Sequence, residues 1–503
     1  MIIGMNTKIR LLTIIIIGYA ITTQAQSSLS LDSCRTLATE NNKALKIASE
    51  KEKKAHYERK AAFAQYLPDF SFTGSYMYNQ KNLSLLDADR YLPIGTVTSN
   101  GSFGFRPDQI NNQWRTTGEG QTIPLDVNGQ PFNPQTNPEK ILWKDYTVIP
   151  KNEFEMDMKH VWAGIFSVVQ PVFMGGKIMA YNQIAKYAEE LAATQKDTEL
   201  QQLILQTDEA YWQTVSLVNK KRLAISYIEL LQRMDTDMQE LIKEGFATKA
   251  DGLSVKVKLN EAEMAETKVD NGLRLTRMLL AQICGLPLDE EFILSDELSE
   301  SLPLNQTNTA VDIEQAYLER PELKSLDLAT KIYQKKETIA RSEMMPSVAL
   351  SANYAISNPS MFNGFQHEFA GMWNVGVIVR VPLFHWGEKM HHLNAAKTET
   401  RIKRLEMEEV KEKISLQINQ SVFHLNETER KVVTAKQNLE SAEENLRHAN
   451  LGFEEGVIPV LQIMEAQSAW LKANSELIDA QIDAKLAEAY LKKAVGKGNI
   501  DRN

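Results

Sequence analysis

The chain has 503 residues, of which 43% are hydrophobic and 24% charged, and its net charge is −9. This composition excludes a wholly disordered or collagen-like chain, and the acidic balance disfavours a protein that coats nucleic-acid phosphates. Mean hydropathy is −0.33 and no long apolar run follows residue 21, so a polytopic helical membrane protein is excluded, whereas membrane strands of alternating polarity are not.

Residues 1–25 predict a secretory signal peptide. A basic start precedes a short apolar run at 11–17, and small residues stand at positions −3 and −1 of a cleavage site after Ala25. The apolar run is too short for a comfortable membrane span, which disfavours an uncleaved anchor. Cys34 lies too far beyond this run to be expected as a lipidated N-terminus. An exported, acidic and cysteine-poor chain suggests a bacterial envelope protein.

The remainder is a tandem repeat. Residues 68–76 align with 346–354 at an offset of 278, and residues 170–173 align with 381–384 at an offset of 211, so the first copy carries 67 extra residues. Length alone suggests about three domains, but the repeat predicts one duplicated unit. Its parts are the signal peptide 1–25, a first repeat 26–285 with a Pro-rich loop insertion at 79–160, a linker 286–310, a second repeat 311–497 and a disordered tail 498–503.

Each repeat is predicted to run helix, strand, strand, long helix, turn, helix. The long helices, at 177–244 and 388–455, have 68 residues each, or roughly 100 Å at ~1.5 Å per residue. Apolar residues recur along these helices at alternating spacings of three and four residues, which indicates coiled-coil packing. One such seam is Ile418, Leu425, Val432, Leu439, Leu446 and Phe453. Segments 31–66, 249–284 and 460–495 have 36 residues each, so two placed end to end match one long helix. An antiparallel coiled-coil rod fits these heptads equally well.

Four segments of about ten residues alternate in polarity and are long enough to cross a bilayer when tilted. In the first, Phe70 and Phe72 share one face, and Ser71 and Thr73 share the other. We expect one aromatic membrane girdle, formed by Tyr76, Tyr78, Trp162, Tyr354 and Trp373. A half-buried sheet of a soluble protein is the alternative. It is disfavoured because the strand pairs of both repeats show the same alternation, with aromatic residues at matching ends.

Four strands cannot close a barrel, and open strand edges are not tolerated in lipid. If these strands span a membrane, several subunits must therefore share one barrel. Two subunits would give eight strands, a barrel filled by its own side chains, whereas three would give twelve. A conducting pore therefore favours at least three subunits.

This order and spacing of motifs resembles the TolC family of outer-membrane channel-tunnels. The resemblance rests on residues 31–45, 66–68, 170–173, 245–251, 344–346, 381–384 and 456–467, together with Gly176 and Gly387. It implies a mixed α and β fold, in which long antiparallel coiled-coil helices form a periplasmic α-barrel and four antiparallel strands per protomer join a shared 12-stranded outer-membrane β-barrel. The implied assembly is a homotrimer.

The resemblance also implies partners and sites. The partners are a periplasmic membrane-fusion adaptor, an inner-membrane pump of the RND or ABC type and outer-membrane lipid, and no nucleic acid is expected. In the family, the helical tips dock the adaptor and close the periplasmic entrance. The matching docking residues are Gly245, Thr248, Gly456 and Pro459, and the matching pore constriction is Asp251, Gln462 and Glu465. An acid usual in the second tip is replaced here by Gln462.

No catalytic, metal or cofactor constellation emerges. His391 and His392 are adjacent, so they do not share a helix face, and no P-loop is present. With Cys34, Cys284 could form at most one disulfide, and we expect each to pack as a small hydrophobe. The sequence therefore predicts a passive duct in the outer membrane, with a periplasmic extension, that exports small molecules or drugs for a tripartite pump. A type I protein-secretion duct and a soluble periplasmic scaffold are the alternatives.

Overall fold

The structure, a computed structural model, describes residues 28–93, 96–97, 103–104, 114–116, 118–125, 128–131, 146–298 and 311–497. The predicted signal peptide and C-terminal tail lie outside these residues. Two compact units are present. A helical unit is drawn from the described residues within Met1–Ala64, Gly175–Met345 and Pro382–Asn503, and a strand unit from those within Gln65–Met174 and Pro346–Val381. Each sequence repeat therefore contributes to both units.

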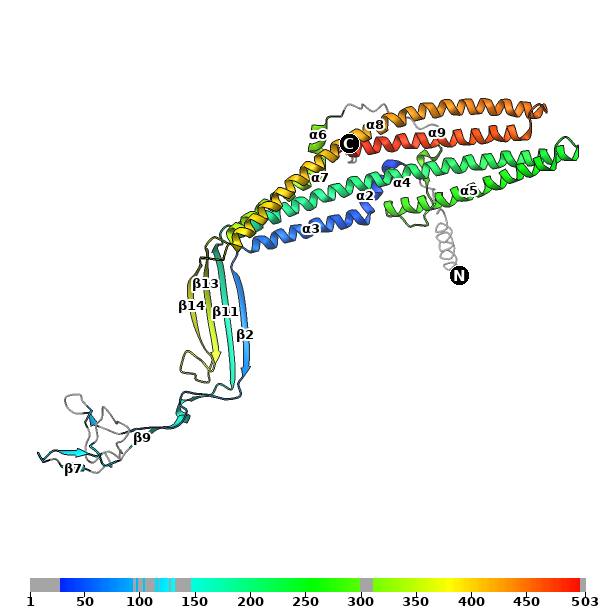
Figure 1. Ribbon diagram of the computed structural model, residues 1–503. Helices are drawn as coiled ribbons and strands as arrows, with labels where there is room; N and C mark the ends of the chain where they lie inside the picture. The colour runs from blue at the N-terminus through cyan, green and yellow to red at the C-terminus, as the bar shows by residue number, and fades with distance from the viewer. Residues whose placement is uncertain are drawn as a thin grey trace, which may run out of the picture. The chain divides into compact units, whose positions relative to one another are not determined.

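The helical unit is built on two long helices, α4 (Lys177–Lys243) and α8 (Glu388–Glu454), of 67 residues each. Both α3 (Lys43–Ala64) and α5 (Lys249–Cys284) pack along α4, and both α7 (Pro321–Ser342) and α9 (Val460–Ala494) pack along α8 (Figure 1). Two shorter helices therefore do partner each long one. Among the described residues, no helix has the length and apolar character needed to cross a membrane.

The first helix of each repeat is broken at the same place. Segment 31–66, predicted as continuous, divides into α2 (Leu31–Asn41) and α3 at Asn42, whose backbone is extended. In the second repeat, α6 (Ile313–Glu319) and α7 are divided at Arg320, and Pro321 opens α7. Proline has no N–H to donate within a helix and favours its first turn. Since Asn42 and Arg320 are 278 residues apart, the break belongs to the repeated architecture.

The heptad seams form the helical core. Leu231 and Met238 of α4 and Ile418 and Leu425 of α8 are almost completely buried. Along α9 the small members of the seam, Ala480, Ala484, Ala487 and Ala494, have no exposed surface. Alanine at these positions lets neighbouring helices approach closely. Contacts also join the repeats, because α4 packs against α7 and α9.

The strand unit is a four-stranded antiparallel sheet of β2 (Asp69–Tyr78), β11 (His160–Phe173), β13 (Ser347–Asn358) and β14 (Ala370–Arg380), in the order β14-β13-β11-β2 (Figure 1). All four predicted strands are present. β11 and β13 pair across the repeat boundary, so one repeat's return strand lies beside the other repeat's outgoing strand.

The insertion predicted as a loop contains short two-stranded ladders in its described parts. These pair β3 (Leu83–Ser84) with β10 (Glu155–Met156), β4 (Arg90–Pro93) with β9 (Tyr146–Ile149), β5 (Thr96–Val97) with β6 (Phe103–Gly104), and β7 (Trp114–Thr116) with β8 (Thr122–Pro124). A 3-10 turn, η2, spans Lys151–Phe154. In the helical unit, β1 (Ser28–Leu29) pairs with β12 (Ile293–Leu294), which precedes a second 3-10 turn, η3 (Ser295–Leu298).

Candidate functional site

The sheet has one aromatic face and one hydroxyl- and amide-bearing face, and two neighbouring cross-strand rows show this directly. The first row aligns Phe72, Phe166, Tyr354 and Trp373. The row one residue away aligns Ser71, Ser167, Asn353 and Asn374. Successive side chains of a strand point to opposite faces, so the two rows lie on opposite sides of the sheet.

The aromatic row is packed within itself and open to its surroundings. The rings of Phe72 and Phe166 lie 4.5 Å apart between centroids. Trp373, however, remains 73% exposed and each of the other three is more than 40% exposed. A contiguous aromatic surface of this kind is unfavourable in water and marks an interaction site or a membrane surface. On the other face, the Asn353 amide donates to Asn374 Oδ1 over 3.1 Å.

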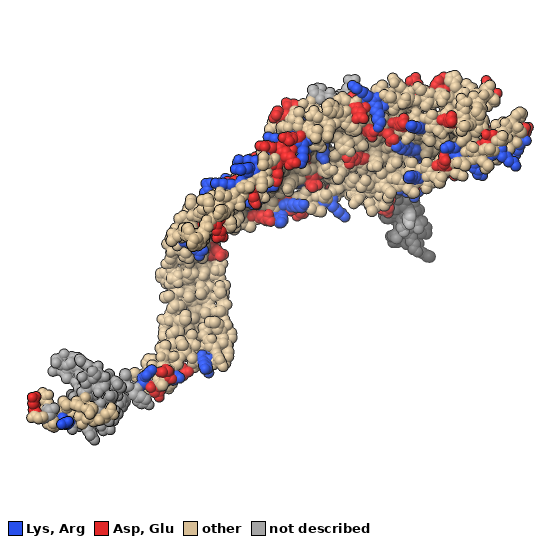
Figure 2. All heavy atoms as spheres, viewed as in Figure 1, with Lys and Arg blue, Asp and Glu red and all other residues tan. Residues whose placement is uncertain are grey.

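Charge is confined to the ends of the four strands, all of whose residues are described. Asp69 opens β2 and Arg380 closes β14, and no other Asp, Glu, Lys or Arg lies within the strands. Figure 2 shows the middle of the strands without these residues on the face in view. Placing an isolated charge in hydrocarbon costs several kcal/mol, so this sheet meets the electrostatic requirement for crossing a bilayer.

The five predicted girdle residues fall on three cross-strand rows of the sheet. Tyr76 lies opposite Trp162, with 4.5 Å between ring centroids, and Tyr78 lies opposite His160. Tyr354 and Trp373 face each other on the row of Phe166, four residues further along β11. Phe72 and Phe166 complete that row, and sequence reasoning did not assign them to the girdle because their alignment depends on pairing between the repeats.

Both edges of the sheet are open within the described chain. β2 and β14 each have a single strand neighbour. An unpaired edge presents a row of backbone donors and acceptors that another strand can satisfy, and in lipid those groups must be satisfied. The chain alone therefore does not complete this structure.

The first helical tip is a tightly capped turn. Gly245 adopts a left-handed φ of 79°, and the Phe246 amide donates back to the Leu241 carbonyl over 2.9 Å. Thr248 then begins α5 with a reciprocal capping box: its amide donates to Asp251 Oδ2 over 2.9 Å, and its hydroxyl accepts from the Asp251 amide. Hydrogen bonds from Thr248 hold the pKa of the Asp251 carboxyl below its usual range. The Asp251 carboxylate therefore caps the first turn of α5.

The second tip repeats the turn without the side-chain cap. Gly456 has a φ of 71°, and the Val457 amide donates to the Gly452 carbonyl over 2.8 Å. Pro459 takes the N-cap position of α9 and makes no side-chain cap. Gln462 and Glu465 follow on α9, and both are exposed. Asp251, Gln462 and Glu465 do not form a hydrogen-bonded cluster within one chain, so a constriction made from them would need several copies.

One hydrophobic cluster joins both tips. Its buried members are Met234, Met238, Val255, Ala449, Val460, Ile463, Met464 and Ala466. Beside it, Gln467 of α9 is 1% exposed and donates to Met234 Sδ over 3.6 Å. Its Oε1 has no hydrogen-bond partner among the described residues. A buried, unsatisfied amide costs free energy, so the contact between the helical hairpins α4–α5 and α8–α9 is weakened at Gln467.

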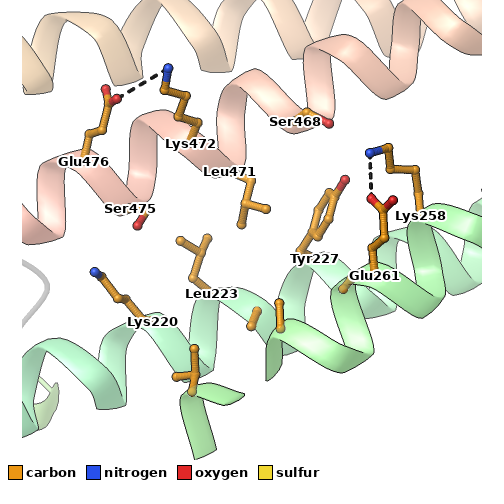
Figure 3. Close-up of a pocket in the computed structure, with 14 residues that line it drawn as sticks. Lys220, Leu223, Tyr227, Lys258, Glu261, Ser468, Leu471, Lys472, Ser475 and Glu476 are labelled. Carbon is orange, nitrogen blue, oxygen red and sulfur yellow. Dashed lines mark hydrogen bonds and ion pairs between the residues drawn. The ribbon is translucent and has the colours of Figure 1, made fainter. Parts of the chain in front are cut away.

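A groove of about 500 Å³ lies further along, between α4, α5 and α9. Leu223, Tyr227 and Leu471 lie in it, as Figure 3 shows. Four of its charged side chains pair with each other, Lys258 with Glu261 at 2.7 Å and Lys472 with Glu476 at 3.8 Å, and Lys220 pairs with Asp479 at 2.6 Å. Among the described residues, no cluster of His, Cys, Asp or Glu could hold a metal ion.

Comparisons with known proteins agree with these features. A family model described as "Outer membrane efflux protein" matches residues 313–497. Nodulation protein T of Rhizobium leguminosarum bv. trifolii is 23% identical over 56% of this chain and 60% of its own length. Outer membrane protein TolC of Vibrio cholerae is 22% identical over 61% of this chain and 69% of its own length. These matches therefore span about two thirds or less of the relatives' lengths.

The fold comparison extends over almost the whole chain. The CmeC outer membrane channel of Campylobacter jejuni superposes with a TM-score of 0.70 at 15% identity, covering 94% of this chain and 87% of that one. The architecture is therefore that of the outer-membrane channel-tunnels. The family model over residues 313–497 and the sequence relatives show that this chain is similar to the TolC-type outer membrane efflux proteins.

Proposed function

We propose that this chain is one subunit of a homotrimeric outer-membrane channel that acts as the passive exit duct of a tripartite efflux pump for small molecules or drugs. The observation that carries this is the strand unit: an exposed aromatic face, an opposite face of Ser and Asn, charge only at the strand ends, and two open edges. Lipid satisfies the first face, and a water-filled lumen satisfies the second.

The repeat supplies the geometry of the missing contact. Within the chain, Phe166 of β11 pairs with Tyr354 of β13. The equivalent positions, at the offsets of 211 and 278, are Val377 of β14 and Tyr76 of β2. These lie on the two open edges, so a neighbouring subunit can repeat between chains the pairing that one chain makes internally.

The long helices also indicate, independently of the sheet, that a second copy of the chain covers part of the surface. Leu205 and Trp212 of α4 are each 7% exposed. Their equivalents on α8, Leu416 and Phe423, are 59% and 70% exposed. Exposed large hydrophobic residues at positions that are buried in the other repeat indicate a surface that a second copy covers. The two repeats would then make equivalent contacts around a closed ring.

Three copies fit the pore better than two. Eight strands enclose only side chains, whereas a twelve-stranded barrel leaves room for a lumen. A lumen lined by Ser and Asn and free of charge between its ends would not reject neutral or charged small molecules electrostatically. We therefore propose that the barrel lets neutral and charged small molecules pass without selecting among them by charge.

The tips supply the contact with the pump. Gly245, Thr248, Gly456 and Pro459 would dock a periplasmic membrane-fusion adaptor that links the duct to an RND or ABC pump in the inner membrane. Exposed apolar side chains at these turns, Phe246 and Val457, support docking. Asp251, Gln462 and Glu465 would line the entrance when three copies meet, and adaptor binding would open it by moving one hairpin against the other.

The duct role involves no reaction, so we assign the chain no enzymatic step. Both repeats would contribute equally to the assembly. Residues 26–285 and residues 311–497, joined by the linker 286–310, would each supply two strands and one long helix.

The test combines cross-linking and conductance in the outer membrane. In a chain carrying Cys34→Ala and Cys284→Ala, Ser75→Cys with Ile378→Cys introduces thiols at positions equivalent to the pair Asn353–Ser167. Directly opposed positions allow a disulfide, whereas positions one diagonal apart do not. Oxidation should yield a covalent trimer that forms ion-conducting pores in a planar bilayer. The register control, Met77→Cys with Ile378→Cys, should stay uncross-linked.

Recovery of the wild-type chain in the soluble periplasm would overturn the channel and favour the scaffold. Cross-linking that stops at dimers would contradict the trimer. A trimer without conductance, or unchanged drug export after deletion of the gene, would contradict the duct.

A further inference from the structure

We infer that the two cysteines form an intramolecular disulfide in the exported protein, a covalent link between α2 and the end of α5. Cys34 and Cys284 are separated by 250 residues but lie in one hydrophobic cluster, and neither has any exposed surface. The Cys284 thiol lies 3.6 Å from the Cys34 carbonyl oxygen. As the sequence predicts, both thiols are free and buried among apolar side chains in the structure, and their juxtaposition was not predictable from the sequence.

The interface around the two thiols is fixed on both sides. On one side, the Asn42 side-chain amide donates to the Ile283 carbonyl over 3.0 Å. Gly285 ends α5 with a φ of 73°, and a Cβ added there would lie 2.5 Å from Asn41 Cβ. The ends of α2 and α5 are therefore in direct contact, next to Cys284.

On the other side, a partly buried ion pair holds α2 against α4. Arg35, which follows Cys34, donates from Nε and Nη2 to the two carboxylate oxygens of Asp208, at 2.8 and 2.7 Å. A bidentate pair of this kind fixes orientation as well as distance. Since the residues flanking both cysteines are anchored, the thiols cannot drift apart in the folded chain.

The second repeat holds the same junction without cysteines. The positions equivalent to Cys34 and Cys284 are Asp312 and Val495. There Val495 packs in an apolar cluster, and Arg320 Nη1 donates to the carbonyls of Lys493 and Ala494, at 3.1 Å each. The first repeat has no such arginine, since Asn42 occupies the equivalent position. Asn42 makes the equivalent bond there, to the Ile283 carbonyl at 3.0 Å, and the disulfide would add a covalent tie at this junction of the first repeat.

The reaction must precede burial. An exported thiol–disulfide oxidoreductase supplies the oxidant: one cysteine thiolate attacks its disulfide and forms a mixed disulfide, and the second cysteine thiolate attacks that bond and expels the oxidoreductase thiolate. The Cys34–Cys284 bond forms, and the two protons and two electrons lost by the cysteines leave the oxidant as a dithiol. In the folded chain neither thiol has any exposed surface, so an oxidoreductase cannot reach either of them. The bond would therefore form during folding and then be shielded from reductants.

The experiment counts thiols in full-length protein from the outer membrane, quenched in acid and denatured before a maleimide-PEG is added. Wild-type protein should take up no label until it is reduced, and two labels afterwards. Cys34→Ala and Cys284→Ala should each take up one label with or without reduction. Two labels on unreduced wild type would overturn the disulfide. A covalent dimer on a non-reducing gel would also overturn it, since the link would then be intermolecular. Neither result depends on channel activity.

Discussion

The exposed ring of Phe423 offers the sharpest test of the proposed assembly. Phe423 is 70% exposed, and its equivalent in the first repeat, Trp212, is 7% exposed. If a neighbouring subunit covers Phe423 to the same degree, about 60% of a side chain of roughly 200 Å² is removed from water. At ~25 cal/mol per Å², this burial stabilises each interface by about 3 kcal/mol, and three interfaces of a trimer by about 9 kcal/mol if they are additive.

We therefore expect Phe423→Ala to weaken the assembly by more than 100-fold per interface while leaving the fold of one chain intact. Native mass spectrometry in detergent and the temperature at which the trimer dissociates on a gel would measure this. Leu318→Ala is the matched control, because Leu318 is 87% exposed and its equivalent, Glu40, is a polar side chain. Unchanged dissociation of Phe423→Ala, or equal weakening by both variants, would refute the equivalence between the repeats.

Four further outcomes are expected. Gln467→Leu removes the buried unsatisfied amide and should strengthen the contact between the hairpins by ~1–3 kcal/mol, lowering pore opening in single-channel records; more frequent opening would contradict this. Thr248→Ala should destabilise the start of α5 by about 1 kcal/mol, seen as faster amide exchange at the first tip, and Thr248→Ser should restore protection. Because the folded pKa of Asp251 is depressed, its capping contribution is complete at neutral pH and is lost as pH falls through that depressed value; tip exchange in Asp251→Asn should therefore lose this acid dependence. Asn374→Asp adds a charge to the polar face and should raise cation over anion permeability several-fold, whereas the uncharged change Asn353→Gln in the same row should leave the ratio unchanged.

Much of the fold was predictable because it is repeated and periodic. The strand faces followed from alternation, and α5 was predicted at its observed bounds. The break at Asn42 was missed because asparagine is not a strong helix breaker, whereas its side chain bonds to Ile283, which is 241 residues away. The tip glycines were identified from their position at the turns, and their left-handed φ values agree with that role.

The sequence by itself determined the helices and strands, their duplication and the polarity of each strand face, because these depend on the local spacing of residues. Only the tertiary structure decided which residues of the two repeats meet. Phe72, Phe166, Tyr354 and Trp373 form one row because β11 pairs with both β2 and β13, and Cys34 reaches Cys284 because α2 lies against the end of α5. Such contacts depend on pairing register and helix packing across hundreds of residues, which no local pattern encodes.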